Sequence, residues 1–182
     1  RYIGDWSSDV CSSDLAMGIA LFALWLLSVV MLTILFVYDL RHFLLPDVLV
    51  WPLTVLGAIG FGILMYLKGV PYSGWPLEVI LSLLPVSGVY GVLYAISGGR
   101  WIGFGDVKLG LFMGLMLGWQ GAILALLVAN YLGFFWVLPA LLRKRLNKDS
   151  RMPFGPFLIL AAFIVFLWGD ALVSWFVDFL MI

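Results

Sequence analysis

The sequence predicts an all-α integral membrane protein, built as a bundle of about six transmembrane helices. Hydrophobic residues make up 64% of the 182 residues and charged residues only 11%, whereas soluble domains are about 45–50% apolar. The apolar residues form long runs that are separated by short polar or Pro/Gly-rich breaks. Nine Trp, seven Tyr and fourteen Phe suit membrane interfaces and lipid-facing surfaces. A formal net charge of zero argues against a nucleic-acid-binding role.

Residues 1–15 differ from the rest of the chain. They are polar and rich in Ser and Asp, they lack an initiating Met, and residues 5–15 look like a translated sequencing adapter. We therefore expect residues 1–15 to be non-native, residues 16–182 to form the membrane domain, and the natural protein to extend further toward its N-terminus. The single cysteine, Cys11, falls in this segment and gives no information on the redox compartment.

The apolar runs define the predicted spans, which are residues 16–38, 48–67, 77–96, 107–142 and 154–176. The first has 23 residues, which at ~1.5 Å per residue cross a ~30 Å hydrocarbon core. The fourth has 36 residues and is too long for one ordinary span. Residues 118–121 (GWQG) offer a reversal point, so we expect two short helices there and six in total.

The cationic residues test this count. With alternating spans, one side of the membrane receives eight of them: Arg41, Arg100, Lys108, Arg143, Lys144, Arg145, Lys148 and Arg151. The other side receives Lys68 alone. Cytoplasmic loops are enriched in Lys and Arg, so the first side is predicted to be cytoplasmic. A single span over residues 107–142 would separate the 143–151 cluster from Arg41 and Arg100, and the charge pattern thus favours two helices.

Two acids lie at predicted span ends on this cytoplasmic side, Asp39 and Asp106. An ionisable group at membrane depth is costly and is read by default as functional. Two close carboxyl groups cannot easily both ionise, so they share a proton, and such a pair can activate water for hydrolysis without a metal. Gly103 and Gly105 flank Asp106 and permit positive φ or close backbone approach. These residues predict an aspartyl hydrolase.

Three segments then resemble one family. Residues 103–109 (GFGDVKL) resemble the GxGDxKL signature of the type IV prepilin peptidases. Residues 38–47 (YDLRHFLLPD) resemble that family's first aspartate motif, in which a Pro-Asp pair ends eight residues after the acid. Residues 153–157 (PFGPF) resemble a third family segment before the final span. The three motifs occur in the family's order and the resemblance covers nearly all of residues 16–182.

The resemblance implies a GxGD-type aspartyl protease with Asp39 and Asp106 as the catalytic pair. It implies prepilin substrates of type IV pili and pseudopilin substrates of type II secretion. Their short basic leaders are cleaved after a glycine at the cytoplasmic face of the bacterial inner membrane, and no metal or other cofactor is required. Many members also N-methylate the new terminus with S-adenosylmethionine and carry an N-terminal cytoplasmic segment, often with CxxC motifs. No part of this chain matches that segment, so methyltransferase activity stays open.

Other interpretations are possible at this stage. An archaeal preflagellin peptidase and a presenilin-like protease share the GxGD motif, but Pro46-Asp47 and residues 154–156 favour the prepilin branch. A membrane transporter or assembly scaffold could use its acids to bind protons or partners. Transporters often contain internal repeats, and the chain shows no convincing one. The sequence does not indicate an oligomeric state.

The polar neighbours of the two acids have competing interpretations. Asp47 could orient the site loop, but we favour a cap at the N-terminus of the second span. Lys108 and Arg41 could steer substrate or favour ionised acids, but we favour ordinary interfacial anchoring. The lone histidine, His42, is interpreted as a boundary residue rather than a metal ligand.

The fourth predicted span carries two further features. Gly110, Gly114 and Gly118 have the spacing of small residues at a close helix contact. Asn130 is expected to form a hydrogen bond between helices, with contact to substrate as the alternative.

Overall fold

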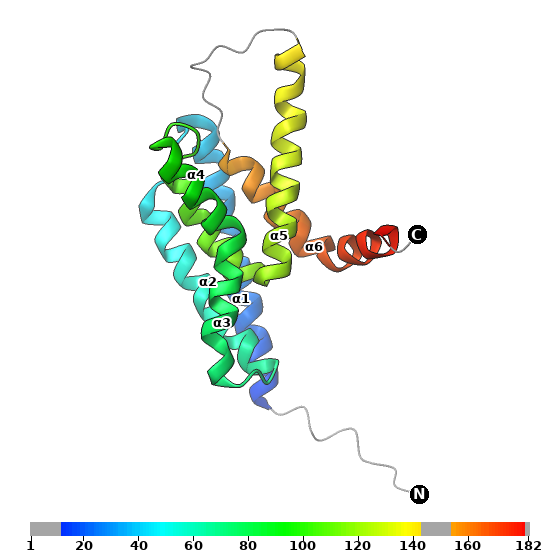
Figure 1. Ribbon diagram of the computed structural model, residues 1–182. Helices are drawn as coiled ribbons and strands as arrows, with labels where there is room; N and C mark the ends of the chain where they lie inside the picture. Colours follow the sequence, from blue (N-terminus) through cyan, green and yellow to red (C-terminus); the bar gives the residue numbers. More distant parts are fainter. Residues whose placement is uncertain (1–11, 143–153, 181–182) are drawn as a thin grey trace, which may run out of the picture.

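The computed structural model describes residues 12–142 and 154–180, and all regular structure in these ranges is helical. This confirms the predicted all-α membrane fold. Figure 1 shows the helices gathered into an elongated bundle. The elements in chain order are α1 (Ser12–His42), α2 (Asp47–Leu67), η1 (Tyr72–Gly74), α3 (Trp75–Leu83), η2 (Leu84–Gly88), α4 (Val89–Ser97), α5 (Phe104–Leu142) and α6 (Gly155–Leu180).

A short turn joins α1 to α2 and positions the first acid. Helix α1 ends at His42, and Phe43 adopts a positive φ of 55°, which is uncommon for a bulky side chain. Pro46 follows in an extended conformation and is the N-cap residue of α2. The fixed φ of proline and its missing N–H suit a position just before a helix. The chain therefore reverses within a few residues of Asp39.

The third crossing is one continuous helical segment made of α3, η2 and α4. Its middle, Leu84–Gly88, is a π-helical turn that contains Pro85. Proline has no N–H to donate to the preceding turn, and the wider π turn accommodates that loss. Gly98, in the left-handed conformation at φ 60°, ends α4, as is common for glycine after a helix. The chain then enters the Gly103–Asp106 motif.

Helix α5 is broken at Gly118, inside the predicted reversal segment. Gly118 has φ 68° and ψ 176°, a backbone conformation that L side chains rarely adopt. Figure 1 shows α5 changing direction along its length, with its yellow half rising away from the break. Four helical segments are long and apolar enough to cross a membrane: Leu15–His42, Asp47–Leu67, Tyr72–Ser97 and Phe104–Pro139. Gly155–Gly169 is a shorter apolar helix, and the count of six crossings stays a prediction.

Helix α5 is the centre of the bundle, because it packs against α6, η2, α2 and α3. Two of its glycines permit this close approach. A Cβ on Gly110 would lie 2.9 Å from the backbone nitrogen of Ser87, and a Cβ on Gly114 would overlap the carbonyl oxygen of Ser82. The predicted close contact is thus confirmed for these two glycines. It is wrong for Gly118, where a Cβ would have no neighbour within 4 Å and the glycine serves to break the helix.

We expect Gly114→Ala to destabilise the fold. The added methyl group meets backbone atoms of Ser82 and Leu83, which cannot rotate away as a side chain could, so the helices must separate. Overpacking of this kind costs about 1–3 kcal/mol. Gly60→Ala is the matched control, since Gly60 is also buried within a helix but a Cβ added to it would meet nothing within 4 Å. Thermal unfolding in detergent should separate the two variants, and equal midpoints would contradict the packing argument.

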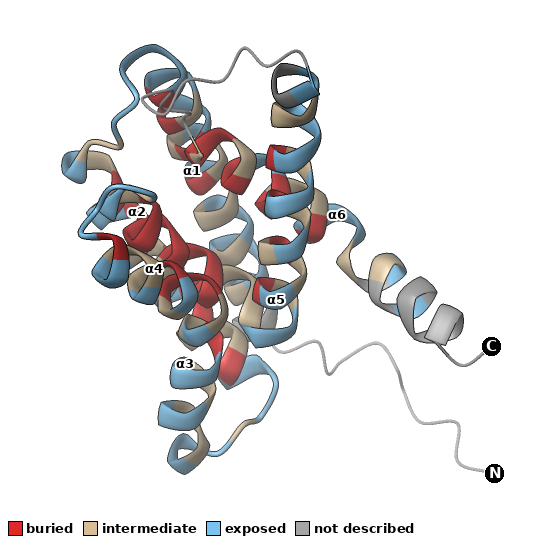
Figure 2. Cartoon of the chain, turned by 45° about the horizontal axis from the view of Figure 1, so that its top comes forward, coloured by how far each residue is buried: buried red, intermediate tan, exposed pale blue. Residues whose placement is uncertain are grey.

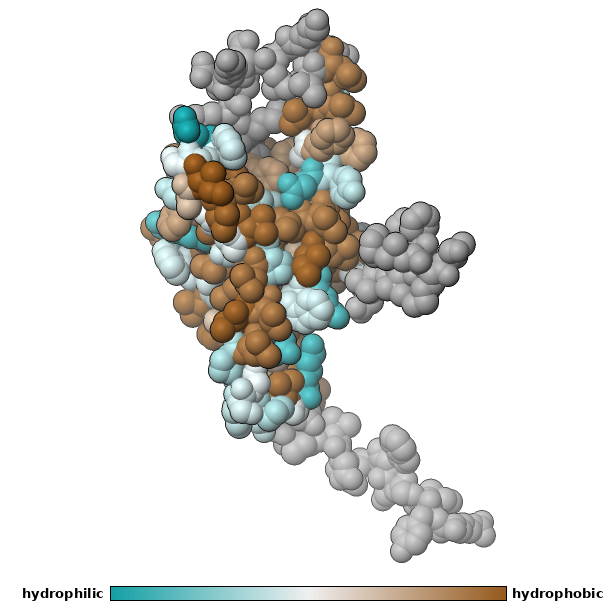
Figure 3. All heavy atoms as spheres, in the orientation of Figure 1, coloured by the Kyte–Doolittle hydropathy of each residue, from teal (hydrophilic) through white to brown (hydrophobic). Residues whose placement is uncertain are grey.

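The surface agrees with a multi-pass membrane protein. Figure 2 shows buried residues on the inward sides of the helices and exposed residues outward, and many exposed side chains are large and hydrophobic. On the face in Figure 3, hydrophobic side chains dominate the middle of the bundle. Residues 143–151 lie outside the described residues, so the cytoplasmic assignment that depends on their charges stays a prediction.

Candidate active site

The structure buries both predicted catalytic acids and brings them into one site. Asp39 lies in the last turns of α1 and Asp106 in the first turn of α5, with exposed fractions of 4% and 7%. They are close enough for their charges to interact. The Oδ2 atom of Asp39 is buried and has no hydrogen-bond partner within the described part of the chain. A buried polar atom without a partner calls for an explanation, and a bound water or substrate would supply one.

Gly155, at the start of α6, closes the site on the Asp39 side. A Cβ on Gly155 would overlap Asp39 Oδ2 and would lie 3.4 Å from Leu45 Cδ1. Only a residue without a side chain permits this approach to the carboxyl group. The sequence identified residues 153–157 as a motif but did not assign Gly155 to the site. The glycine within that motif was the only sequence feature that could have indicated Gly155, because its contact with Asp39 depends on tertiary packing.

The two glycines beside Asp106 have ordinary backbone angles, and what distinguishes them is the absence of a side chain. Neither Gly103 nor Gly105 is among the described residues with positive φ, so that part of the expectation is wrong. Close approach is confirmed for Gly105, where a Cβ would lie 2.8 Å from Leu45 Cβ. At Gly103 a Cβ would lie 3.5 Å from Asp106 Oδ2, an ordinary contact distance. Leu45, in the turn between α1 and α2, therefore packs against the starts of both α5 and α6.

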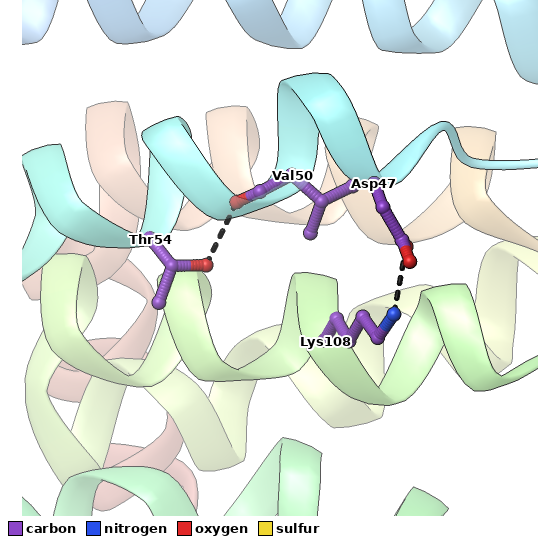
Figure 4. A network of polar contacts seen from close by, with 4 residues as sticks. All are labelled: Asp47, Val50, Thr54 and Lys108. Atoms are coloured by element: carbon purple, nitrogen blue, oxygen red, sulfur yellow. Dashed lines mark hydrogen bonds and ion pairs between the residues drawn. The ribbon is translucent and has the colours of Figure 1, made fainter.

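An ion pair ties α2 to the start of α5. Lys108 Nζ donates a hydrogen bond to Asp47 Oδ1 at 2.7 Å (Figure 4). The lysine side chain is only 11% exposed and the aspartate side chain 59%. Lys108 Nζ also lies 4.7 Å from the centroid of the Phe104 ring and 5.6 Å from that of Trp51, both within cation–π range. The lysine is thus a buried crosslink two residues from Asp106.

This contact corrects two expectations. Pro46 is the N-cap of α2 and there is no side-chain capping hydrogen bond, so Asp47 does not cap the helix through its side chain. It still lies in the first turn, where a carboxylate interacts favourably with the helix dipole. Interfacial anchoring is wrong for Lys108, because its ammonium group is inside the bundle rather than at the surface. Arg41 is exposed, and its anchoring role stays a prediction.

Comparison with known proteins decides the family. A sequence model of the type IV leader peptidase family matches residues 16–138, which include both acids and the GFGDVKL segment. The chain belongs to the type IV leader peptidase family. Residues 103–109 and 38–47 therefore lie in a family-matched region, as the motifs indicated, whereas Gly155 lies beyond it.

Several relatives of this family member have the name prepilin leader peptidase/N-methyltransferase. The one from Aeromonas salmonicida is 31% identical over 173 residues, covering 94% of this chain and 57% of the relative. The one from Pseudomonas aeruginosa is 32% identical over 143 residues, covering 78% and 48%. The one from Pseudomonas putida is 36% identical over 132 residues, covering 70% and 43%. The chain spans about half the length of these relatives, and no solved structure matches it.

These names agree with the prepilin branch rather than with a preflagellin peptidase, a presenilin-like protease or a transporter. The structure also places two other polar residues that the sequence singled out, His42 and Asn130. His42 is exposed, and its Nδ1 atom lies 3.2 Å from the carbonyl oxygen of Tyr38. No group of three or more potential metal-ligating side chains occurs in residues that the structure describes. Asn130 Nδ2 contacts the hydroxyl of Tyr90 at 3.4 Å, which confirms a bond between helices.

The ion pair gives an asymmetric prediction for stability. Asp47→Asn leaves the buried Lys108 ammonium without its counter-charge, whereas Lys108→Met leaves only an exposed carboxylate that water can solvate. We expect Asp47→Asn to cost about 1–3 kcal/mol of unfolding free energy and Lys108→Met to cost less. Denaturation of both purified variants checks this order. A reversed order of stability would contradict the buried-charge argument.

Proposed function

We propose that this protein is an aspartic endopeptidase that removes the leader peptide from type IV prepilins and type II secretion pseudopilins. The observation that carries the proposal is the shared burial of Asp39 and Asp106, with one oxygen of Asp39 lacking a hydrogen-bond partner in the described part of the chain. The family and the names of the relatives support a prepilin substrate. We place the reaction at the cytoplasmic face of the bacterial inner membrane, on the charge asymmetry of the loops.

The proposed chemistry divides two roles between the carboxyl groups. The ionised carboxylate takes a proton from water as the water oxygen bonds to the scissile carbonyl carbon. The protonated partner transfers its proton to the carbonyl oxygen, which becomes a hydroxyl of the tetrahedral intermediate. The intermediate then collapses as the C–N bond breaks. The proton first taken from water passes to the leaving amine, and one hydroxyl of the intermediate returns its proton to the partner carboxylate as the carbonyl reforms. We assign the water to Asp39, because its Oδ2 atom has no hydrogen-bond partner among the residues that the structure describes.

The surroundings of the acids support this division of roles. Burial removes bulk water, so the like charges of two carboxylates repel more strongly and a shared proton is favoured. Gly155 lets α6 approach Asp39 Oδ2 more closely than any residue with a side chain could. The basic leader of a prepilin is attracted to the net negative charge of the acid pair. We propose a lipid bilayer as the setting, and no metal or other cofactor for cleavage.

The test is co-expression with a prepilin, followed by mass spectrometry of the prepilin's new N-terminus. We expect cleavage directly after the leader glycine. The same spectrum shows whether the mass of a methyl group has been added, and so reports on methyltransferase activity, for which S-adenosylmethionine would be the co-substrate. Intact prepilin in the presence of folded, membrane-inserted protein would contradict the proposal.

A further inference from the structure

A cavity lies at the end of the bundle opposite the acids. Helix α2 begins at Asp47, beside the site, and its 21 residues extend about 30 Å to Leu67. The cavity is lined at this far end by Lys68, Glu78, Ser82 and residues 117–120 and has a volume of about 240 Å³. One water in the liquid occupies ~30 Å³, so the cavity can hold a ligand of several heavy atoms. The proposed peptidase chemistry makes no use of it.

A cation and an anion line this cavity, and no ion pair joins them in the described part of the chain. Lys68 follows the last turn of α2 and Glu78 lies in the first turn of α3, and both border the cavity. Within residues 12–142 and 154–180 the ion pair found is that of Lys108 with Asp47, not one between these two side chains. A cation and an anion that face one space without contact are complementary to a ligand that carries both charges.

The wall of the cavity also offers hydrogen-bonding groups. The break of α5 at Gly118 borders it, and Gln120, two residues further along, adds a side-chain amide to the lining. An amide can both donate and accept hydrogen bonds. Ser82 also lines the cavity, and it is 1% exposed with no hydrogen-bond partner for its hydroxyl within the described residues. These observations are independent of the two charges.

The apolar part of the lining and the position of the cavity limit the chemical class of ligand that it can bind. Phe61, Met65 and Leu117 supply hydrophobic contacts. Trp119 also borders the cavity, and tryptophan is enriched at membrane–water interfaces, which suits a cavity near the membrane surface. An amphipathic ligand with a zwitterionic head therefore fits. We propose that this cavity binds a phosphoethanolamine group, with its phosphate near Lys68 and its ammonium near Glu78. Phosphatidylethanolamine and free phosphoethanolamine share this chemistry, and the experiment separates them.

Native mass spectrometry of the detergent-solubilised protein tests the proposal. The protein is equilibrated with equal amounts of phosphatidylethanolamine and phosphatidylcholine, whose methylated ammonium cannot donate hydrogen bonds to Glu78. We expect about tenfold preferential retention of phosphatidylethanolamine, the factor that one charge-assisted hydrogen bond provides. Glu78→Gln should abolish the preference and Lys68→Ala should weaken retention of both lipids. Arg100→Gln removes a charge at the opposite end of the bundle and is the control, which should retain both lipids as the unmodified protein does.

Two further arms complete the test. Excess soluble phosphoethanolamine should displace the lipid if the free compound binds as well, and failure to displace it identifies the lipid as the source. Equal retention of the two lipids by the unmodified protein would overturn the proposal. An unchanged preference in folded Glu78→Gln, with melting temperature as the check on folding, would overturn it too. Prepilin cleavage is measured in parallel, and its loss or retention does not bear on the lipid preference.

Discussion

Replacing Asp39 or Asp106 by Asn is expected to abolish prepilin cleavage while the protein remains folded in the membrane. Asparagine has nearly the same shape as aspartate but can neither accept the proton from water nor donate one as a carboxylic acid does. General acid–base catalysis contributes about 10²–10⁴-fold, so each variant should lose at least that factor. The measurement is the initial rate of leader removal by purified variants, normalised to folded protein.

Stability is the second measurement on the same variants. Two buried carboxyl groups within charge range repel when both ionise, so a neutral amide at either position should leave the melting temperature unchanged or raise it. A structural acid would show the opposite, a lower melting temperature. Asp170→Asn, the same chemical change in the second half of α6, is the control and should cleave normally. Normal cleavage by either Asn variant of the pair would refute the paired-acid mechanism.

The sequence predicted the positions of most helices because hydrophobicity alone determines them. The predicted spans 48–67 and 77–96 lie close to the observed helical ranges Asp47–Leu67 and 75–97. Pro46 marks the start of the first of these ranges and Gly98 marks the end of the second. The break at Gly118 was also predictable, because glycine in a GWQG segment interrupts an overlong run. The π turn at Pro85 was not, since a proline inside an apolar run can be absorbed in several ways.

The site was predictable only where its chemistry is local. Asp39 and Asp106 were found because a charge at the end of an apolar run is costly. The partner of Lys108 was missed because it lies 61 residues earlier in the chain, and local pattern made anchoring the simpler interpretation. Gly155 was missed for the same reason. A glycine in a motif indicates that space is needed, but only the folded chain shows that Asp39 occupies it.

Gly155→Ala is the sharpest test of that last contact. The added methyl group would overlap Asp39 Oδ2, so the carboxyl group must rotate or α6 must shift. Gly155 is not among the described residues with positive φ, so alanine introduces no backbone strain at this position. We therefore expect the folded state to persist while catalysis falls. A displacement of about 1 Å in a catalytic group can cost ~10²-fold in rate.

The kinetic pattern distinguishes a displaced acid from a damaged binding surface. A displaced Asp39 lowers kcat with little change in KM, because the prepilin helix still binds while the water is no longer aligned. Gly60→Ala, at a helix position where a Cβ would meet nothing within 4 Å, should keep both constants. A rise in KM at constant kcat for Gly155→Ala would instead place Gly155 against the substrate. Unchanged kinetics would show that the carboxyl group tolerates the methyl group, and that Gly155 does not set the position of Asp39.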